Sequence, residues 1–216
     1  MKKLLAIIGI LVLFVAGYLL WAFKFRTGAK KDKGPEPVPL AVSKHSDGFN
    51  QSAEQVLSSY YDMTEAFVNW DSVKVNTTAA SLQSALEAIK IDELQPDTAI
   101  YQSSLDPLAN AKAQVALVIS EPTLEKKRVA LNTLSENLRL LMVIIKYDRA
   151  KMYWQECPMA FGEDNSGFWL SKSDVVRNPY MGLKHPTYKD DMLQCGGPKD
   201  TINFTVPLLP ANPEAK

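Results

Sequence analysis

The segment "SEPTLEKKRVALNTLSENLRLLMVIIKYD", which runs from Ser120 to Asp148, decides the fold of this chain. Ser120 can cap a helix, and Pro122 suits a first helical turn, where a missing backbone N–H has no cost. Apolar residues then recur at steps of three, four or seven, which is the period of an amphipathic helix and not of a strand. The predicted buried stripe consists of Leu124, Leu131, Leu134, Leu138, Leu141 and Ile145.

Three earlier segments show the same period. Apolar residues follow it from Gln51 to Phe67, from Val75 to Ile89, and from about Thr98 to Ile119. Pro107 is expected to kink the third helix or to split off its first turn. Four amphipathic helices with short connections predict an antiparallel four-helix bundle over residues 49–150. The expected fold class is therefore all-α.

The bundle contains no convergent set of polar residues. Glu54, Asp62 and Glu65 fall on the first helix, but no Glu-x-x-His pair follows them, and a di-iron bundle requires such pairs. No GxSxG, HExxH or Gly-rich phosphate loop is present. The 24 basic and 24 acidic residues balance, so no overall field favours nucleic acid. We expect no enzyme activity, no nucleic-acid partner and no small-molecule substrate.

Residues 1–23 are predicted to be a transmembrane anchor. The stretch from Leu4 to Phe23 holds twenty uncharged residues, enough to cross a hydrocarbon core of about 30 Å as a helix. A cleaved signal, the alternative, has a shorter apolar region. The basic residues after the span favour a cytoplasmic domain by the positive-inside rule, whereas the short basic tail and the paired cysteines favour export. We expect a single-pass inner-membrane protein with its domain in the periplasm.

The remaining segments differ in composition. Residues 24–48 are charged and then Pro-rich, which predicts a tether. After Asp148 the helical period fades, and residues 151–204 are dense in Gly, Pro, Asn and aromatic residues. We expect these residues to form an irregular C-terminal lobe packed on the bundle, followed by a Pro-rich tail at 205–216.

Both cysteines and four of the seven methionines lie in this lobe. Cys157 and Met159 stand in "CPM", and Met192 and Cys195 stand in "MLQC". Thiolate and thioether donors select Cu(I) and similar soft ions, so these four residues are candidate metal ligands. Structural zinc sites need four Cys or His ligands, and zinc is therefore disfavoured. Weaker candidate ligands are Met181 and His185.

Two other interpretations of the cysteines stay open. A disulfide would close a separation of 38 residues and stabilise the domain by roughly 3–4 kcal/mol, with the methionines as core packing. The two thiols could also be unrelated. A redox-dependent version joins metal and disulfide, because only the reduced pair can bind an ion. A catalytic cysteine is disfavoured, since nothing in the sequence places His185 beside Cys157.

The blocks "CPMA", "NSGFWLS", "NPYMG" and "MLQCG" occur in this order and resemble the domain of unknown function 3347 family. That family also occurs with CusB-type copper and silver efflux adaptors. The resemblance covers about Phe49 to Phe204, and its specific part is Tyr153 to Gly196. It implies a soft-metal role with Cu(I) or Ag(I) and an efflux or other envelope protein as partner. The implied ligands are Cys157, Met159, Met192 and Cys195, with Asn178, Pro179, Tyr180 and Gly182 as scaffold.

Overall fold

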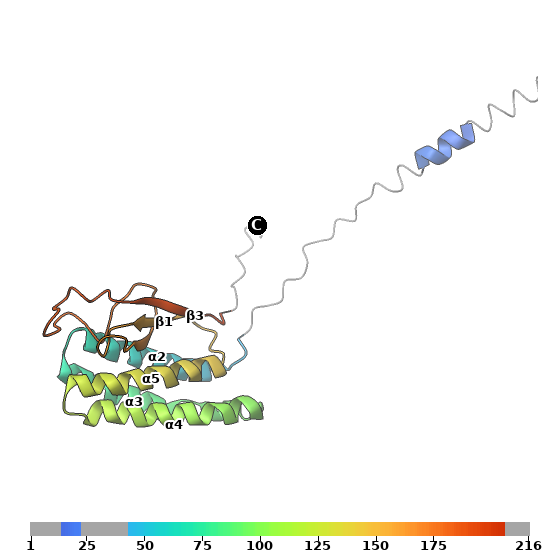
Figure 1. The fold of residues 1–216 in the computed structure, drawn as a ribbon. Helices are drawn as coiled ribbons and strands as arrows, with labels where there is room; N and C mark the ends of the chain where they lie inside the picture. Colours follow the sequence, from blue (N-terminus) through green and yellow to red (C-terminus); the bar gives the residue numbers. More distant parts are fainter. Residues whose placement is uncertain (1–13, 23–42, 206–216) are drawn as a thin grey trace, which may run out of the picture. The chain divides into compact units, whose positions relative to one another are not determined.

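The computed structural model describes residues 14–22 and 43–205. The chain forms two compact units, Met1–Leu40 and Ala41–Lys216. The second unit contains four long helices and a three-stranded sheet (Figure 1). Its helices are α2 (Asp47–Val68), α3 (Ser72–Ala88), α4 (Thr98–Ser120) and α5 (Leu124–Ile144), with a short 3-10 helix, η1 (Ile91–Leu94). Its strands are β1 (Met152–Cys157), β2 (Gly167–Ser171) and β3 (Gly197–Ile202).

Each of the four long helices begins after a side chain that caps it. The sequence suggested Ser120 as the cap of α5, but Ser120 is the last residue of α4. Thr123 takes this role, because its hydroxyl accepts a hydrogen bond from the backbone N–H of Lys126. The expected break at Pro107 is also absent: α4 continues through this buried proline. The four capping residues are Ser46, Asp71, Asp97 and Thr123.

The helices pack in the order of the chain, α2 on α3, α3 on α4 and α4 on α5. Figure 1 shows α2 and α5 on the side of the sheet, with α3 and α4 in the layer beyond them. The stripe of α5 faces inward, since Leu131, Leu134, Leu138 and Leu141 are fully buried. The α5 helix also packs against β2. One core therefore extends from the helices into the lobe.

The hydroxyl group of Tyr60 links two helices to the sheet. Tyr60 of α2 is fully buried, and its oxygen lies 2.6 Å from the Ser135 hydroxyl of α5. The backbone N–H of Leu170 in β2 donates to the same oxygen over 3.1 Å. The Ser135 hydroxyl of α5 and the Leu170 N–H of β2 thus share one buried hydrogen-bond partner. The lobe is consequently part of the folded unit and not an appendage.

The prediction of an all-α fold is wrong. The C-terminal lobe, which was expected to be irregular, contains an antiparallel sheet with strand order β2-β1-β3. The β1–β3 pairing shifts register after Trp154, because Lys199 is an extra residue in β3. In the central strand β1, the neighbours Trp154 and Gln155 are both buried, so its side chains do not follow the simple alternation that signals a strand. Trp154 of β1 stacks on Phe168 of β2 at 5.4 Å between ring centroids. Such cross-strand aromatic pairs stabilise short strands.

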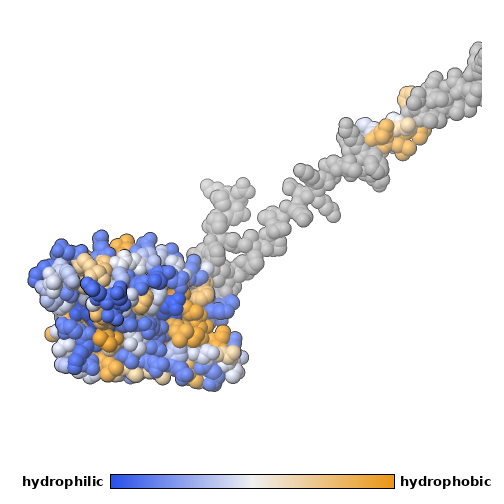
Figure 2. Space-filling model, viewed as in Figure 1, coloured by the Kyte–Doolittle hydropathy of each residue, from blue (hydrophilic) through white to orange (hydrophobic). Residues whose placement is uncertain are grey.

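The predicted membrane anchor is also corrected. Within the described parts of the chain, no helix is long and apolar enough to cross a membrane. Residues 14–22 are helical and mainly hydrophobic (Figure 2), and the rest of the expected span from Leu4 to Phe23 lies outside the described residues. The structure therefore does not support a single-pass inner-membrane location with a periplasmic domain. Most of the predicted tether at 24–48 and of the predicted tail at 205–216 falls outside the described residues; at the end of the tether segment, Ser46 caps α2, which begins at Asp47.

Candidate functional site

The structure brings the two cysteines together at one edge of the sheet. Cys157 is the last residue of β1 and is fully buried, whereas Cys195 lies two residues before β3 and is partly buried. Their sulfur atoms are 3.1 Å apart, and both side chains are free thiols. The site is thus a dithiol in which the two sulfur atoms point at each other.

Gly196 makes this approach possible. Its φ is +101°, in the left-handed region that L side chains rarely adopt. A β-carbon at this position would lie 1.8 Å from the backbone oxygen of Glu156, which is a severe clash. The pairing of Glu156 with Gly197 in the β1–β3 ladder therefore requires a glycine immediately before it. This close contact of the two backbones places Cys195 beside Cys157.

Asn178 holds the other side of the Cys195 turn. Its side chain is fully buried, and its amide nitrogen donates to the backbone oxygen of Cys195 over 3.0 Å. Its amide oxygen accepts hydrogen bonds from the backbone N–H groups of Tyr180 and Met181. Its own backbone N–H donates to the oxygen of Leu193. One asparagine thus fixes the "NPYMG" turn and the "MLQC" turn relative to each other.

The two methionines of the predicted site lie close to the dithiol through their backbones. The N–H of Cys195 donates to the oxygen of Met192 over 3.0 Å, which closes a turn from Met192 to Cys195. The backbone N–H of Met159 interacts with the Cys195 thiol, and the Met159 side chain is 36% exposed. Across residues 14–22 and 43–205, no group of three or more His, Cys, Asp or Glu side chains could hold a metal.

The environment strongly disfavours a Cys195 thiolate. Burial is the largest cause, and the hydrogen bond and nearby charge of Cys157 add to it, while the Met159 backbone N–H acts in the opposite direction. Together they raise the pKa of Cys195 to about 12. Nucleophilic cysteines have a lowered pKa instead. At neutral pH Cys195 is therefore a protonated thiol.

Met181 and His185, the weaker candidates, lie elsewhere. Met181 is buried, and its backbone oxygen accepts a hydrogen bond of 2.8 Å from the indole N–H of Trp70. His185 packs edge-on against Trp70, with 5.5 Å between the ring centroids. Both residues thus belong to the contact between the lobe and the α2–α3 turn. The structure divides the predicted set of six residues into a thiol corner and a separate tryptophan corner.

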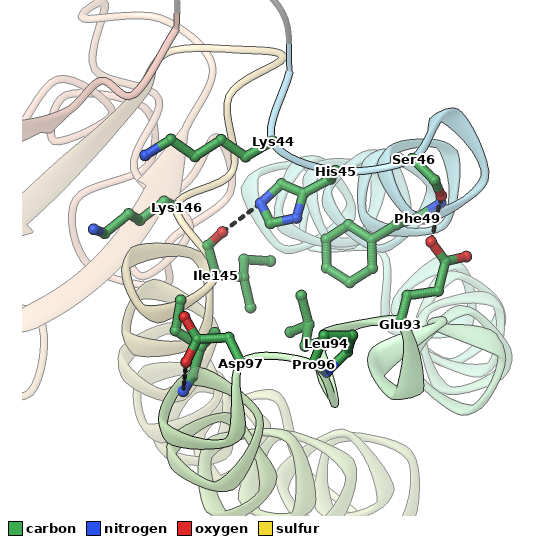
Figure 3. Close-up of a pocket in the computed structure, with 11 residues that line it drawn as sticks. Lys44, His45, Ser46, Phe49, Glu93, Leu94, Pro96, Asp97, Ile145 and Lys146 are labelled. Atoms are coloured by element: carbon green, nitrogen blue, oxygen red, sulfur yellow. Dashed lines mark hydrogen bonds between the residues drawn. The ribbon is translucent and has the colours of Figure 1, made fainter.

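A further cavity of about 430 Å³ lies where α2 begins and α5 ends (Figure 3). The ring of His45 faces the backbone oxygen of Ile145 at 2.6 Å and packs on Phe49. The Ser46 hydroxyl donates to the Glu93 carboxylate. These polar groups already have partners within the protein, and acids and lysines are mixed around the rim. This arrangement is typical of a helix-end junction, and it supplies no convergent set of reactive groups.

Arg128 was missed from the sequence, and Asn178 was named only as scaffold that the family resemblance implies. Arg128 lies on the leucine stripe of α5, four residues after Leu124 and three before Leu131, and it is 4% exposed. A charged residue in a buried stripe is unusual, and this signal could have identified it. Asn178 had no comparable signal, because Asn-Pro is first of all a turn former.

Residues 56–149 match the model of a family described as a protein of unknown function (DUF3347). The match confirms the family resemblance, although it covers α2 to α5 and ends before β1. The blocks between Tyr153 and Gly196 lie beyond it, and an association with CusB-type adaptors is not part of the match. No curated protein and no solved structure matches this chain significantly.

Proposed function

We propose that this chain, whose residues 56–149 belong to the DUF3347 family of unknown function, is a non-enzymatic dithiol module. In the reduced state Cys157 and Cys195 bind a soft metal ion of the Cu(I) or Ag(I) type, as a metal-handling or efflux accessory would. When oxidised, the same pair closes into a disulfide and releases the ion. The proposal rests on one observation, the distance of 3.1 Å between the two sulfur atoms.

The donor chemistry fits a soft monovalent ion. Thiolates are soft donors, and the backbones of Met159 and Met192 contact Cys195. The Met159 side chain is exposed and that of Met192 is half-buried, and the proposal assigns their thioethers to the same sulfur set. Two metal–thiolate bonds of about 2.3 Å hold their sulfur atoms roughly 3.8–4.6 Å apart, so the pair has to open by roughly 1 Å. Cys195 is only partly buried and can move by this amount, while Cys157 stays in the core. A bound ion would replace both thiol protons.

The closed state follows from the same geometry. A disulfide requires the two sulfur atoms to approach within bonding distance, and their separation of 3.1 Å supports this step. In the oxidation each thiol gives up one proton and one electron, and an external disulfide is reduced to two thiols. A thiol donor reverses this exchange, and the reduced protein then has both thiol ligands again.

The non-enzymatic part of the proposal is supported by the protonation of the site. A thiol nucleophile needs a neighbouring cation, a base or a helix N-terminus that lowers its pKa. The causes acting on Cys195 raise its pKa instead, with burial as the largest. His185, the histidine that could have served as a base, packs against Trp70 in the other corner of the lobe.

The test combines a metal titration with intact mass. Reduced wild-type protein is titrated with Cu(I) against a competing chelator, in parallel with oxidised protein and with a Cys157→Ser, Cys195→Ser double variant. We expect one ion per reduced chain, no uptake by the oxidised chain or the double variant, and a mass two protons lower after oxidation. Met159→Leu and Met192→Leu should weaken binding, and Met142→Leu, in the core of α5, serves as the matched control.

Two results would reject the proposal. If the double variant binds Cu(I) as tightly as the wild type, the thiols are not the ligands. If the oxidised protein keeps two alkylatable thiols, the pair does not close. A chain that forms the disulfide but never binds metal in the reduced state supports the alternative function, a structural or protein-interaction module fastened by a Cys157–Cys195 bridge.

A further inference from the structure

A second cavity of about 430 Å³ lies between the start of α5, the α2–α3 turn and the lobe. Its lining differs from that of the thiol corner, because it consists mainly of aromatic rings and cationic groups. The residues that carry the argument are Trp70, Glu125, Arg128, Phe161, Tyr180 and His185.

Arg128 is a buried cation without a full set of partners. Its Nε donates to the backbone oxygen of Pro179 over 3.0 Å, but Nη2 is enclosed and has no hydrogen-bond partner in the described structure. None of the ion pairs found among the described residues includes Arg128, although the negative charge of Glu125 acts on it from the same helix. Removal from water lowers the pKa of this guanidinium to about 10. A buried charge of this kind is costly unless a counter-ion approaches it.

Trp70 holds the guanidinium in place. The central carbon of the Arg128 group lies 4.0 Å from the centroid of the Trp70 ring, a close cation–π contact. Trp70 itself has a φ of +57°, which is strained backbone for a bulky residue. The strain persists because the indole N–H is bonded to Met181 and Leu183 pairs with Val68 in the same turn. The cation is thus positioned at the cavity wall by a rigid platform.

His185 adds a neutral donor to the same cavity. Its Nδ1 accepts hydrogen bonds of 3.2 Å from the backbone N–H groups of Thr187 and Tyr188. The neutral ring therefore carries its proton on Nε2. Burial, followed by the charge of Arg128, lowers the pKa of His185 and favours this neutral form. The rings of Phe161 and Tyr180, in edge contact at 5.2 Å between centroids, provide an apolar wall.

We propose that this cavity is a binding site for a small aromatic monocarboxylate. Its carboxylate would accept hydrogen bonds from Arg128 and from His185 Nε2, and its ring would pack on Phe161 and Tyr180. Because Nε is bonded to Pro179 and Nη2 is enclosed, the carboxylate would meet the guanidinium at the remaining nitrogen, Nη1, through a charge-assisted hydrogen bond, which is stronger than a neutral one. Glu125 also lines the cavity, and its negative charge opposes a dianion such as phosphate. A singly charged acid with a flat apolar group therefore fits best.

The first test needs no variant. Full-length protein is titrated with phenylacetate, with its neutral amide phenylacetamide, and with inorganic phosphate, while the indole N–H resonance of Trp70 is followed by NMR. We expect phenylacetate to bind at least tenfold more tightly than the amide or phosphate and to shift the Trp70 signal. Equal binding of acid and amide, or no binding of the acid at all, would overturn the proposal.

A pair of variants then locates the anion contact. Arg128→Lys keeps the charge but loses the planar guanidinium that lies over Trp70, and Arg139→Lys is the matched control, because Arg139 lies on the same helix over Trp154 and pairs with Asp200. We expect Arg128→Lys to weaken phenylacetate binding at least tenfold and Arg139→Lys to leave it unchanged. His185→Phe, which keeps a ring and removes the donor, should weaken binding several-fold and covers the case in which Arg128→Lys fails to fold. Unaltered binding in both the Arg128→Lys and His185→Phe variants would refute the site.

Discussion

Substitution of Tyr60 by phenylalanine removes one oxygen atom from the point where α2, α5 and β2 meet. The Leu170 N–H, which donates to that oxygen over 3.1 Å, is then left buried without a partner. The Ser135 hydroxyl keeps its hydrogen bond of 2.7 Å to the Leu131 oxygen, so the loss of its contact with Tyr60 costs little free energy. An orphaned buried donor costs about 1–3 kcal/mol, and we expect Tyr60→Phe to lower the free energy of unfolding by that amount.

The assay is urea denaturation followed by circular dichroism, with the midpoint and the slope fitted separately. Tyr61→Phe is the matched control, because Tyr61 is the neighbouring residue on α2 and no hydrogen bond of its hydroxyl occurs among the described residues. The control should stay within about 0.5 kcal/mol of the wild type. Amide hydrogen exchange of Leu170 gives an independent measure, and its protection should fall in Tyr60→Phe alone. A variant as stable as the wild type, with Leu170 still protected, would refute the reasoning.

The same residue predicts a dependence on alkaline pH. Burial raises the pKa of Tyr60 in the folded protein above its usual value near 10, which it keeps when unfolded. The stability from this group is therefore fully present below about pH 10 and is lost as the pH rises further, because only the unfolded chain releases the proton. We expect the alkaline loss of stability to be smaller in Tyr60→Phe than in the wild type. Equal losses in both proteins would show that Tyr60 is not responsible.

Three further predictions concern the lobe. Gly196→Ala should cost about 2–4 kcal/mol, measured by thermal unfolding, and should slow disulfide closure, because its β-carbon meets Glu156. Alkylation of Cys195 at pH 9 should be on the order of 100–1,000-fold slower in the folded than in the urea-unfolded protein, and equal rates would contradict its raised pKa. Arg177→Gln should cost less than about 1 kcal/mol at pH 7, since its ion pair with Glu65 is half exposed. Arg177 lowers the pKa of Glu65, so the stability difference between the wild type and Arg177→Gln should disappear as the pH falls below about 4. A stability difference that persists in acid would show that the ion pair is not its cause.

The helices were predictable because their signal is local and repeated. Leu131, Leu134, Leu138 and Leu141 each report the same period, and all four are fully buried. The start of α5 was less certain, since Ser120 and Thr123 are both capping residues and only the end of α4 decides between them. Such boundaries depend on neighbouring elements and not on the segment itself.

The sheet was not predictable in the same way. The strands are short, and the burial of both Trp154 and Gln155 in the central strand breaks the alternation on which strand prediction depends. The proximity of Cys157 and Cys195 was raised as a hypothesis from composition, but its cause lies in the backbone contact at Gly196. Met181 and His185 looked like members of the same cluster only because they are close in sequence. The contact with Trp70, which is more than one hundred residues away, separates them from the thiols.

The polar contacts between the helical part and the lobe have a consequence for how the chain matures. Tyr60, Trp70 and Arg128 have hydrogen-bond partners at Leu170, Met181 and Pro179, all of which leave the ribosome after the last helix. In a nascent chain that ends near residue 149, Tyr60 has its partner Ser135, but the Trp70 indole and the Arg128 Nε lack theirs. We therefore expect such an intermediate to be loosely packed and to expose the surface later covered by the sheet. Synthesis of residues 150–205, and not completion of the helices, would then commit the protein to its native state.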